Sequence, residues 1–389
     1  AMSAMDNGAK DVMVVEKLSR FGGSTSVSGA VVAAENTYYT QSIGLEPNSE
    51  VWLEEWKASS DSDIGVLGKD PGYPTYERVS NYFTQVGETV NWLEDKGVAH
   101  WVTYPFFPNG RYQVPDYVID SETGAADPEG GYMLIDHMVD WLKNHDADLR
   151  LSTTGTKLLT NDAGDVIGAT VQDASGSYDV YASRGVVLAT GGFAANVELR
   201  SAYNTQWADL GDSIKSTNHA GATGDGIKML QKLGADFVQM GNIQLLPLGD
   251  PVTGSLSGNI EHDVETRIFI NKEGNRFVNE GGRRDDMTNA LFAQTDAYMW
   301  IVMDSDTYPT GDERNNFGET ANQLVEAGRA VKADTLEELA EKMNVPADTL
   351  IAAVTEFNRH AEGGDLAGTP DEFGRTLYKT PIDTAPFYA

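Results

Sequence analysis

The chain has 389 residues, with 28 basic and 59 acidic side chains and therefore a formal net charge of −31. Such a charge disfavours non-specific nucleic-acid binding and docking on an anionic membrane, because both ligands are polyanions. No apolar run approaches the roughly 18–20 residues of a spanning helix. The absence of cysteine excludes disulfides and thiolate metal sites, but it suits a cytosolic and an exported protein alike.

The length predicts two domains at roughly 100–200 residues each. The first residues indicate a short helix closed by Gly8, followed by a buried parallel strand over Asp11–Glu16. A domain rarely opens within a helix, so we expect a strand and a glycine-rich turn to precede this segment. Residues 79–96 and 131–142 carry apolar side chains at helical spacing.

The apolar period then changes from helical to extended. Residues 157–160, 166–171 and 178–181 are separated by glycine-containing turns and predict an antiparallel meander. The run Gly185–Ala189 predicts another buried strand. A helix with glycines at its amino end is expected over 224–233.

From about Leu248 the composition changes, and predicted loops rich in Gly, Ser and Asp follow. Arg267–Ile270 then predicts a strand. Thr335 begins a capping-box sequence and Pro346 occupies a favourable first-turn position, so a helix is expected to begin at each. These signals favour an α/β domain interrupted by a second unit from about 248 to 378.

The first candidate site follows the first predicted strand. Glu16-Lys17 ends that strand, and Gly22-Gly23 opens a loop. In doubly wound nucleotide folds a strand-end carboxylate accepts ribose hydroxyls, and a glycine turn lets backbone N–H groups approach an anion. A strand cap and a flexible loop are the alternative interpretation. Other small or hydroxyl-bearing residues of this loop are Ser24, Thr25, Ser26, Ser28 and Gly29.

Two further glycine motifs occur later in the chain. Ala189-Thr190-Gly191 ends a predicted strand, where open α/β sheets bind ligands, or it is a simple strand-to-loop turn. Thr223-Gly224-Asp225 opens a predicted helix, where it would either meet a phosphate or merely cap the helix.

A run of alternating charge forms the last candidate site. Arg283-Arg284-Asp285-Asp286 contains two cations followed by two carboxylates. Such runs are often solvated ion-pair clusters, and a functional arginine is the alternative.

Together these motifs resemble, in order and spacing, the flavoprotein family of soluble fumarate reductases, flavocytochrome c and succinate-dehydrogenase-like enzymes. The resemblance implies a Rossmann-like α/β FAD-binding domain with an antiparallel meander, interrupted by an α+β capping domain. The implied boundaries are 1–247 for the FAD-binding domain, 248–378 for the capping domain and 379–389 for the return to the first. Further matching segments are 161–168, 220–226, 271–277, 279–280 and 386–389.

The resemblance also implies residue roles toward FAD. Glu16 would hold the adenosine ribose, the backbone near Thr156 would meet the adenine, and Thr223 to Asp225 would face the cofactor's linker. The first glycine loop and Thr190-Gly191 would line the pyrophosphate and flavin. The full implied cofactor-binding set is Glu16, Lys17, Gly22, Gly23, Ser24, Thr25, Ser26, Ser28, Gly29, Thr156, Ala189, Thr190, Gly191, Thr223, Gly224 and Asp225.

The family pattern places its catalytic arginine at Arg284, with Asp285 the nearest orienting carboxylate. Arg284 would protonate one alkene carbon while flavin N5 delivers hydride to the other. Substrate-carboxylate binding, or an ion pair with Asp285, is the alternative role. No metal site is expected.

Departures from the pattern concern the substrate. Leu246 stands where the family has a fumarate-binding histidine, Glu261 is a candidate relay carboxylate, and His262 is a candidate substrate contact or an exposed loop residue. These differences make a larger or less charged unsaturated substrate the expectation, rather than fumarate.

Other family features fall outside this sequence. The Gly-x-Gly-x-x-Gly turn would precede it, and a His-His-Thr segment and a second substrate arginine would follow it. A heme or FMN electron-donor module is a further implied partner. A non-catalytic fragment or an acidic binding protein that keeps the fold is the alternative to an enzyme.

Overall fold

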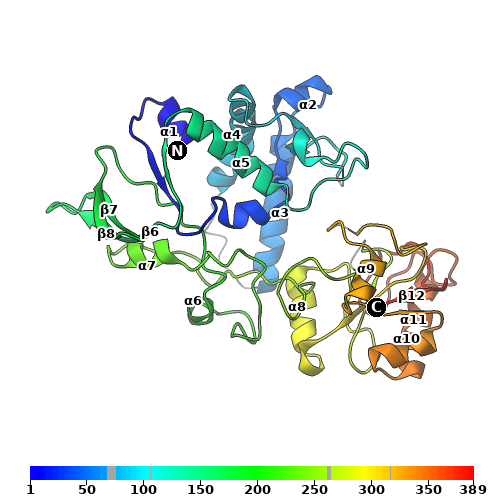
Figure 1. Ribbon diagram of the computed structural model, residues 1–389. Helices are drawn as coiled ribbons and strands as arrows, with labels where there is room; N and C mark the ends of the chain where they lie inside the picture. The colour runs from blue at the N-terminus through cyan, green and yellow to red at the C-terminus, as the bar shows by residue number, and fades with distance from the viewer. Residues whose placement is uncertain (68–75, 106, 261–263, 316) are drawn as a thin grey trace. The chain divides into compact units, whose positions relative to one another are not determined.

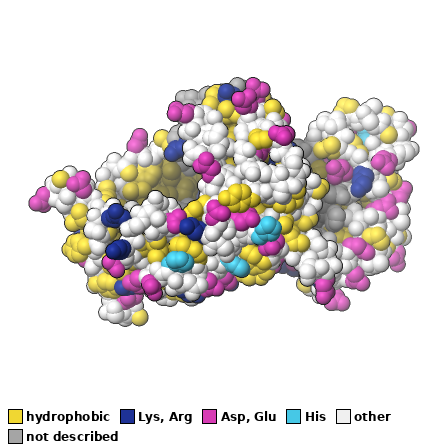
Figure 2. All heavy atoms as spheres, turned by 90° about the horizontal axis from the view of Figure 1, so that it is seen from above, with side chains coloured by type: hydrophobic (Ala, Val, Ile, Leu, Met, Phe, Trp, Pro, Cys, Tyr) yellow, Lys and Arg dark blue, Asp and Glu magenta, His cyan; other side chains and the backbone are white. Residues whose placement is uncertain are grey.

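The computed structural model describes residues 1–67, 76–105, 107–260, 264–315 and 317–389. The chain divides into two compact units (Figure 1). Unit 1 comprises residues 1–196 and 218–240, and unit 2 comprises residues 197–217 and 241–389. Within the described ranges, none of the helices has the length and apolar character needed to cross a bilayer. Figure 2 shows acidic side chains scattered over the face in view, as the net charge requires.

Unit 1 is built from helices and three small sheets. Its helices are α1 (Met2–Asp6), η1 (Gly23–Val27), α2 (Tyr38–Ser42), α3 (Ser49–Leu67), α4 (Tyr76–Asp95), η2 (Asp116–Val118), α5 (Gly131–Asn144) and α7 (Asp225–Gln231). Its strands are β1 (Met13–Val15), β2 (Val32–Ala33), β3 (Trp101–Thr103), β4 (Tyr112–Pro115), β5 (Asp148–Arg150), β6 (Thr154–Thr160), β7 (Val166–Asp173) and β8 (Gly176–Tyr181).

The strands of unit 1 form one parallel pair and two antiparallel sheets. β1 pairs in parallel with β5, so the predicted first strand is present, although Val15 at its end is 36% exposed. β4 lies between β2 and β3. β6, β7 and β8 form the predicted meander, and α7 contacts β6 (Figure 1). The core of this unit centres on Trp101 and Val114, which are fully buried.

The predicted buried strand at Gly185–Ala189 is wrong. These residues form no strand, and Val187 is 87% exposed. A strand satisfies its backbone N–H and C=O groups through a neighbour, and no described strand pairs with this segment. The apolar run alone therefore does not produce a strand here.

Unit 2 packs short strands against helices. Its elements are α6 (Val197–Ala202), β9 (Ile268–Ile270), α8 (Arg284–Phe292), η3 (Thr295–Ala297), β10 (Trp300–Val302), α9 (Ala321–Glu326), β11 (Lys332–Ala333), α10 (Leu336–Met343), α11 (Ala347–His360) and β12 (Phe387–Tyr388). β9 pairs antiparallel with β10, and all three β9 residues are buried.

Both helices predicted from their start signals are present in unit 2. Thr335 is the N-cap of α10 and accepts a hydrogen bond from the Glu338 N–H, while Pro346 is the N-cap of α11. The apolar faces of these helices lie in one core with Ile268 and Val302. This core holds the β9–β10 sheet in place, and the chain continues from β9 to α8.

The observed units differ from the predicted boundaries at three places. Residues 197–217 belong to unit 2, and the later boundary falls at 240/241 rather than at 247/248. Residues 379–389 also belong to unit 2, where β12 pairs with β11.

Candidate functional site

The first and third glycine motifs meet in unit 1 through one lysine. The Lys17 ammonium donates to Thr223 Oγ1 at 2.5 Å and lies 2.7 Å from Asp225 Oδ2. Burial raises the pKa of the Asp225 carboxyl, but the hydrogen bonds from Lys17 and Thr223 outweigh burial and hold the pKa below its ordinary value. Asp225 is therefore a fixed anion at the first turn of α7.

The second motif packs against the third. The Gly224 N–H donates to the Gly192 carbonyl at 2.9 Å, and the Ala195 N–H donates to the Ala222 carbonyl at 3.0 Å. Gly226 lies so close to Thr190 that a Cβ added there would be 2.1 Å from Oγ1. The residues after the predicted strand thus reach the start of α7 even though the strand itself is absent.

The first glycine loop is held between two other segments. Gly22, whose φ is +121°, precedes η1, and Ser24 donates to the Asn218 side chain at 3.2 Å. On the other side, the Gly131 N–H donates to the Ser28 carbonyl at 2.6 Å. A Cβ on Gly131 would be 2.0 Å from the Thr25 carbonyl oxygen, so only glycine permits this approach.

The two expected adenosine contacts lie just after β1 and on β6, which belong to different sheets of unit 1. Glu16 follows β1, and its Oε1 accepts the Leu18 N–H at 2.9 Å. Thr156 is exposed and lies at a register shift of the β6–β7 ladder, between Gly155 and Lys157. A bulge takes one residue out of the regular pairing, and bulges are frequent next to active sites.

These residues fit the adenosine and phosphate parts of FAD. A carboxylate at a strand end, hydroxyls and glycine N–H groups match the ribose and pyrophosphate. Space is present as well, because no atom lies within 4 Å of a Cβ built on Gly23, Gly191 or Gly192. The three glycine motifs of unit 1 therefore supply suitable groups and are tied together directly.

The predicted arginine lies in unit 2 at the amino end of α8. Arg283 is the N-cap, and Arg284 is the first helical residue and is exposed. Among the described residues, the Arg284 side chain makes no ion pair or hydrogen bond. The amino end of a helix carries partial positive charge, so a guanidinium here strengthens an anion-attracting end.

Asp285 has partners other than Arg284. Its Oδ2 accepts from Gln206 at 3.2 Å and lies 4.0 Å from the Arg283 guanidinium. The Arg283 pair agrees with the ion-pair cluster that the charge run suggested, whereas Gln206 was not predicted as a partner. Gln206 is 79 residues away in sequence, and no local pattern signals its proximity.

The substrate candidates are only partly described. Leu246 is half-buried in unit 2. Glu261 and His262 lie outside the described residues. The chain resumes at Val264, whose carbonyl accepts from Arg375 Nη2 at 2.8 Å.

A buried charged cluster holds the segment that leads into α8. Glu280 is fully buried and accepts from Arg276 Nε at 2.9 Å and Arg375 Nη1 at 2.7 Å. Its Oε1 also accepts the Phe269 N–H of β9 at 3.1 Å. Because Glu280 precedes Arg284 by only four residues, this cluster fixes where α8 begins.

Comparison with known proteins identifies the family. The model of the family described as FAD binding domain matches residues 1–389. The chain is 31% identical to urocanate reductase of Eggerthella lenta over 393 residues, and 32% identical to NADH:acrylate oxidoreductase of Vibrio harveyi over 318 residues. These matches cover 100% and 82% of the chain, but only 60% and 30% of the two relatives.

A solved structure of a flavocytochrome c3 fumarate reductase has a similar fold. The structure of the open conformation of a flavocytochrome c3 fumarate reductase matches all of the chain and 63% of its own chain, with a TM-score of 0.74 and 25% identity. The chain therefore belongs to the FAD binding domain family. Its relatives are fumarate, urocanate and acrylate reductase flavoproteins, and its fold is the mixed α/β fold of flavocytochrome c3 fumarate reductase with small antiparallel sheets.

Proposed function

We propose that this chain is the flavin- and substrate-binding part of an oxidoreductase that reduces, or forms, a carbon–carbon double bond. The observation that carries the proposal is the joining of the cofactor motifs in unit 1. Lys17 connects to Thr223 and Asp225, and Gly192 connects to Gly224, in a chain that matches an FAD-binding family along its whole length. Unit 1 would hold FAD, and unit 2 would contribute the substrate residues.

Bound FAD supplies hydride chemistry. The part proposed for this chain is the proton at the second alkene carbon, donated by Arg284. With one hydride and one proton, the C=C bond becomes a CH–CH bond and the arginine is left neutral. Because an arginine pKa exceeds about 12, the transfer needs a water-poor site and a later proton to restore the guanidinium.

Asp285 is the proposed carboxylate of that proton return. Its contacts with Gln206 and Arg283 hold it beside the first turn of α8, one residue after Arg284. Glu261 is the alternative proton relay. Asp285 or Glu261 would position Arg284 or return its proton, whereas Arg284 would contact the substrate.

The proposed substrate is an unsaturated organic acceptor larger or less charged than fumarate. Leu246 offers an apolar surface where the family pattern has a cation-forming histidine, so one anionic group of fumarate would lose its partner. His262 remains a proposed contact. The electron donor would be a heme or FMN module, in keeping with relatives such as fumarate reductase (cytochrome) of Shewanella frigidimarina.

The test is made on the natural protein that contains this chain. We expect it to purify yellow, and to oxidise reduced viologen when supplied with unsaturated carboxylates or enones. A protein that acquires no flavin absorbance after incubation with FAD would contradict the proposal. That result would instead favour an acidic binding protein that keeps the fold.

A further inference from the structure

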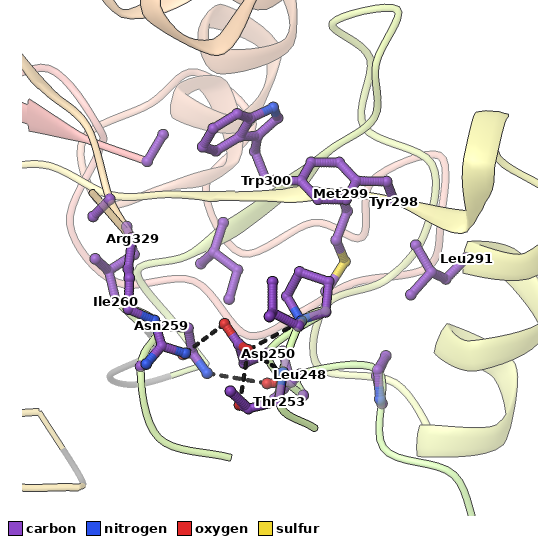
Figure 3. Close-up of a pocket in the computed structure, with 18 of the residues that line it drawn as sticks. Leu248, Asp250, Thr253, Asn259, Ile260, Leu291, Tyr298, Met299, Trp300 and Arg329 are labelled. Atoms are coloured by element: carbon purple, nitrogen blue, oxygen red, sulfur yellow. Dashed lines mark hydrogen bonds and ion pairs between the residues drawn. The ribbon is translucent and has the colours of Figure 1, made fainter. Parts of the chain in front are cut away.

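Unit 2 contains a cavity that the proposed reaction does not use. Its volume is about 530 Å³, within the range of small-molecule sites, and every residue of its wall belongs to unit 2. Figure 3 shows an ion pair, Asp250 with Arg329, on one side and the aromatic residues Tyr298 and Trp300 on another.

Arg329 presents a guanidinium to this cavity. One of its nitrogens, Nη2, pairs with Asp250, and the side chain remains 32% exposed. Gly258 makes room for the group, because a Cβ there would lie 2.1 Å from the Arg329 Cζ. Among the described residues, Nε and Nη1 have no hydrogen-bond partner, so donors of the planar fork are available to a ligand.

Asp250 holds that guanidinium in place. Its Oδ1 accepts from the N–H groups of Val252 at 3.0 Å and Thr253 at 2.6 Å, and from the Thr253 hydroxyl at 2.8 Å. Its Oδ2 faces Arg329, and the side chain is only 10% exposed. Asp250 is therefore engaged on both oxygens and is a support for Arg329 rather than a ligand group.

The remaining wall is largely apolar. Leu248, Ile260, Leu291 and Met299 contribute aliphatic or thioether surface, and Trp300 adds an aromatic face. A ligand that fills the cavity would thus bury apolar atoms while placing a polar group at Arg329. Apolar burial contributes about 25 cal/mol per Å², so the body of the ligand supplies much of the affinity.

The cavity lies away from Arg284 but shares elements with it. Leu291 is the seventh residue after Arg284 on α8, which is about 10 Å along the helix axis. The wall segment 247–260 also begins directly after Leu246 and ends directly before Glu261. A ligand here would therefore contact α8 and the segment that directly follows Leu246 without touching Arg284 itself.

We propose that this cavity binds an amphiphilic monocarboxylate, with its carboxylate on Arg329 and its aliphatic or aromatic body against Leu248, Leu291, Met299 and Trp300. The guanidinium offers a carboxylate a positive charge and N–H donors on Nε and Nη1 that have no partner among the described residues. The site goes beyond the proposed reductase activity, and its binding can be measured without turnover.

The binding test uses saturated carboxylates, which contain no double bond to reduce. Isothermal titration of the natural protein with butyrate, hexanoate and 3-phenylpropionate should give saturable binding, with hexanoate tighter than butyrate by up to about fourfold per added methylene. Hexan-1-ol, which lacks the carboxylate, should bind more weakly than hexanoate. No saturable binding at about 10 mM would overturn the proposal.

Two substitutions should change the affinity in opposite directions. Arg329→Gln should weaken hexanoate binding by about 10- to 100-fold, because a charged hydrogen-bond donor is lost. Asp250→Asn should strengthen binding by about two- to fivefold, since it removes a competing negative charge while its amide oxygen keeps the turn at Thr253. If the ion pair only fastened the loop, neither variant would have these effects, and that result would overturn the proposal.

Arg314→Gln is the matched control, because Arg314 is an exposed arginine of the same unit outside the cavity wall. It should bind hexanoate like the unmodified protein.

A final measurement separates two sources of the ligand, and this measurement alone depends on the proposed function. If the carboxylate is the tail of a long substrate, hexanoate raises the KM for an enone acid whose double bond is separated from its carboxylate by several methylenes, at constant kcat. If it is a separate ligand, that KM does not rise in parallel with hexanoate occupancy.

Discussion

Glu280→Gln should destabilise unit 2, because Glu280 is the centre of its buried charged cluster. The carboxylate is fully buried between Arg276 and Arg375, and Asp371 is the second buried carboxylate, 2.8 Å from Arg276 Nη2. The substitution keeps the side-chain shape but removes one negative charge. Two buried guanidiniums would then share a single carboxylate.

The expected loss follows from the cost of leaving a buried charge without its partner, which is about 3–5 kcal/mol. Glutamine retains one acceptor oxygen, so we expect about 3 kcal/mol. For a unit of this size each kcal/mol lowers Tm by about 2–4 °C, which gives a shift of about 6–12 °C. Differential scanning calorimetry should show this shift in the transition of unit 2 and little change in that of unit 1.

Asp365→Asn is the matched control. It also removes a carboxylate paired with an arginine of unit 2, but this pair with Arg359 is solvent-exposed. Exposed pairs contribute little because water screens them, so no resolvable shift is expected. Equal shifts for Glu280→Gln and Asp365→Asn would refute the argument that burial gives the cluster its strength.

Three further outcomes are expected. Lys17→Met should weaken FAD binding about tenfold, measured by flavin fluorescence, because Asp225 loses its cation; unchanged affinity would contradict the proposed cradle. Gly226→Ala should destabilise unit 1 by about 1–3 kcal/mol in urea unfolding, because the added methyl collides with Thr190, and an unchanged midpoint would be inconsistent with that contact. Burial raises the pKa of the Asp371 carboxyl, but its hydrogen bonds, including the one from Arg276, lower that pKa overall. The ionised Asp371 therefore stabilises unit 2 above its unfolded pKa of about 3.9, and this contribution is lost as the pH falls through the lower folded pKa. Asp371→Asn should flatten that acid-side loss in a pH series of unfolding curves, and an unaltered slope would argue against it.

The parts of the fold that were predictable have strong local signals. The meander follows from turns such as Asp173–Gly176, across which β7 and β8 pair. α10 and α11 begin where Thr335 and Pro346 indicated, because capping acts within one helical turn. Such signals depend only on residues close in sequence, so they can be interpreted without knowing the rest of the fold.

The errors and omissions arise where distant residues decide the outcome. The run Gly185–Ala189 has strand composition, but strand formation depends on a pairing partner, and none is present among the described strands. The charge run at Arg283 lies at the start of α8, and its exposed Arg284 and its Arg283–Asp285 pair also agree with the surface-cluster interpretation.

Spatial partners in the candidate site were equally inaccessible. Lys17 and Asp225 were each implied as cofactor residues, but they are 208 positions apart and their ion pair has no sequence signature. The Asp250–Arg329 pair and its cavity likewise join segments far apart in the chain. The family resemblance supplied candidate residues, whereas the contacts among them came from the structure.

The central claim is that Arg284 supplies the proton in flavin-dependent reduction of a double bond. The most direct measurement is single-turnover reoxidation of reduced flavin by an unsaturated acceptor in the natural protein, compared among Arg284→Ala, Arg283→Ala and the unmodified form. We expect Arg284→Ala to keep its flavin but to lose at least about 100-fold in rate, the contribution typical of a positioned acid, while Arg283→Ala changes little. Unimpaired reoxidation in Arg284→Ala would contradict the claim.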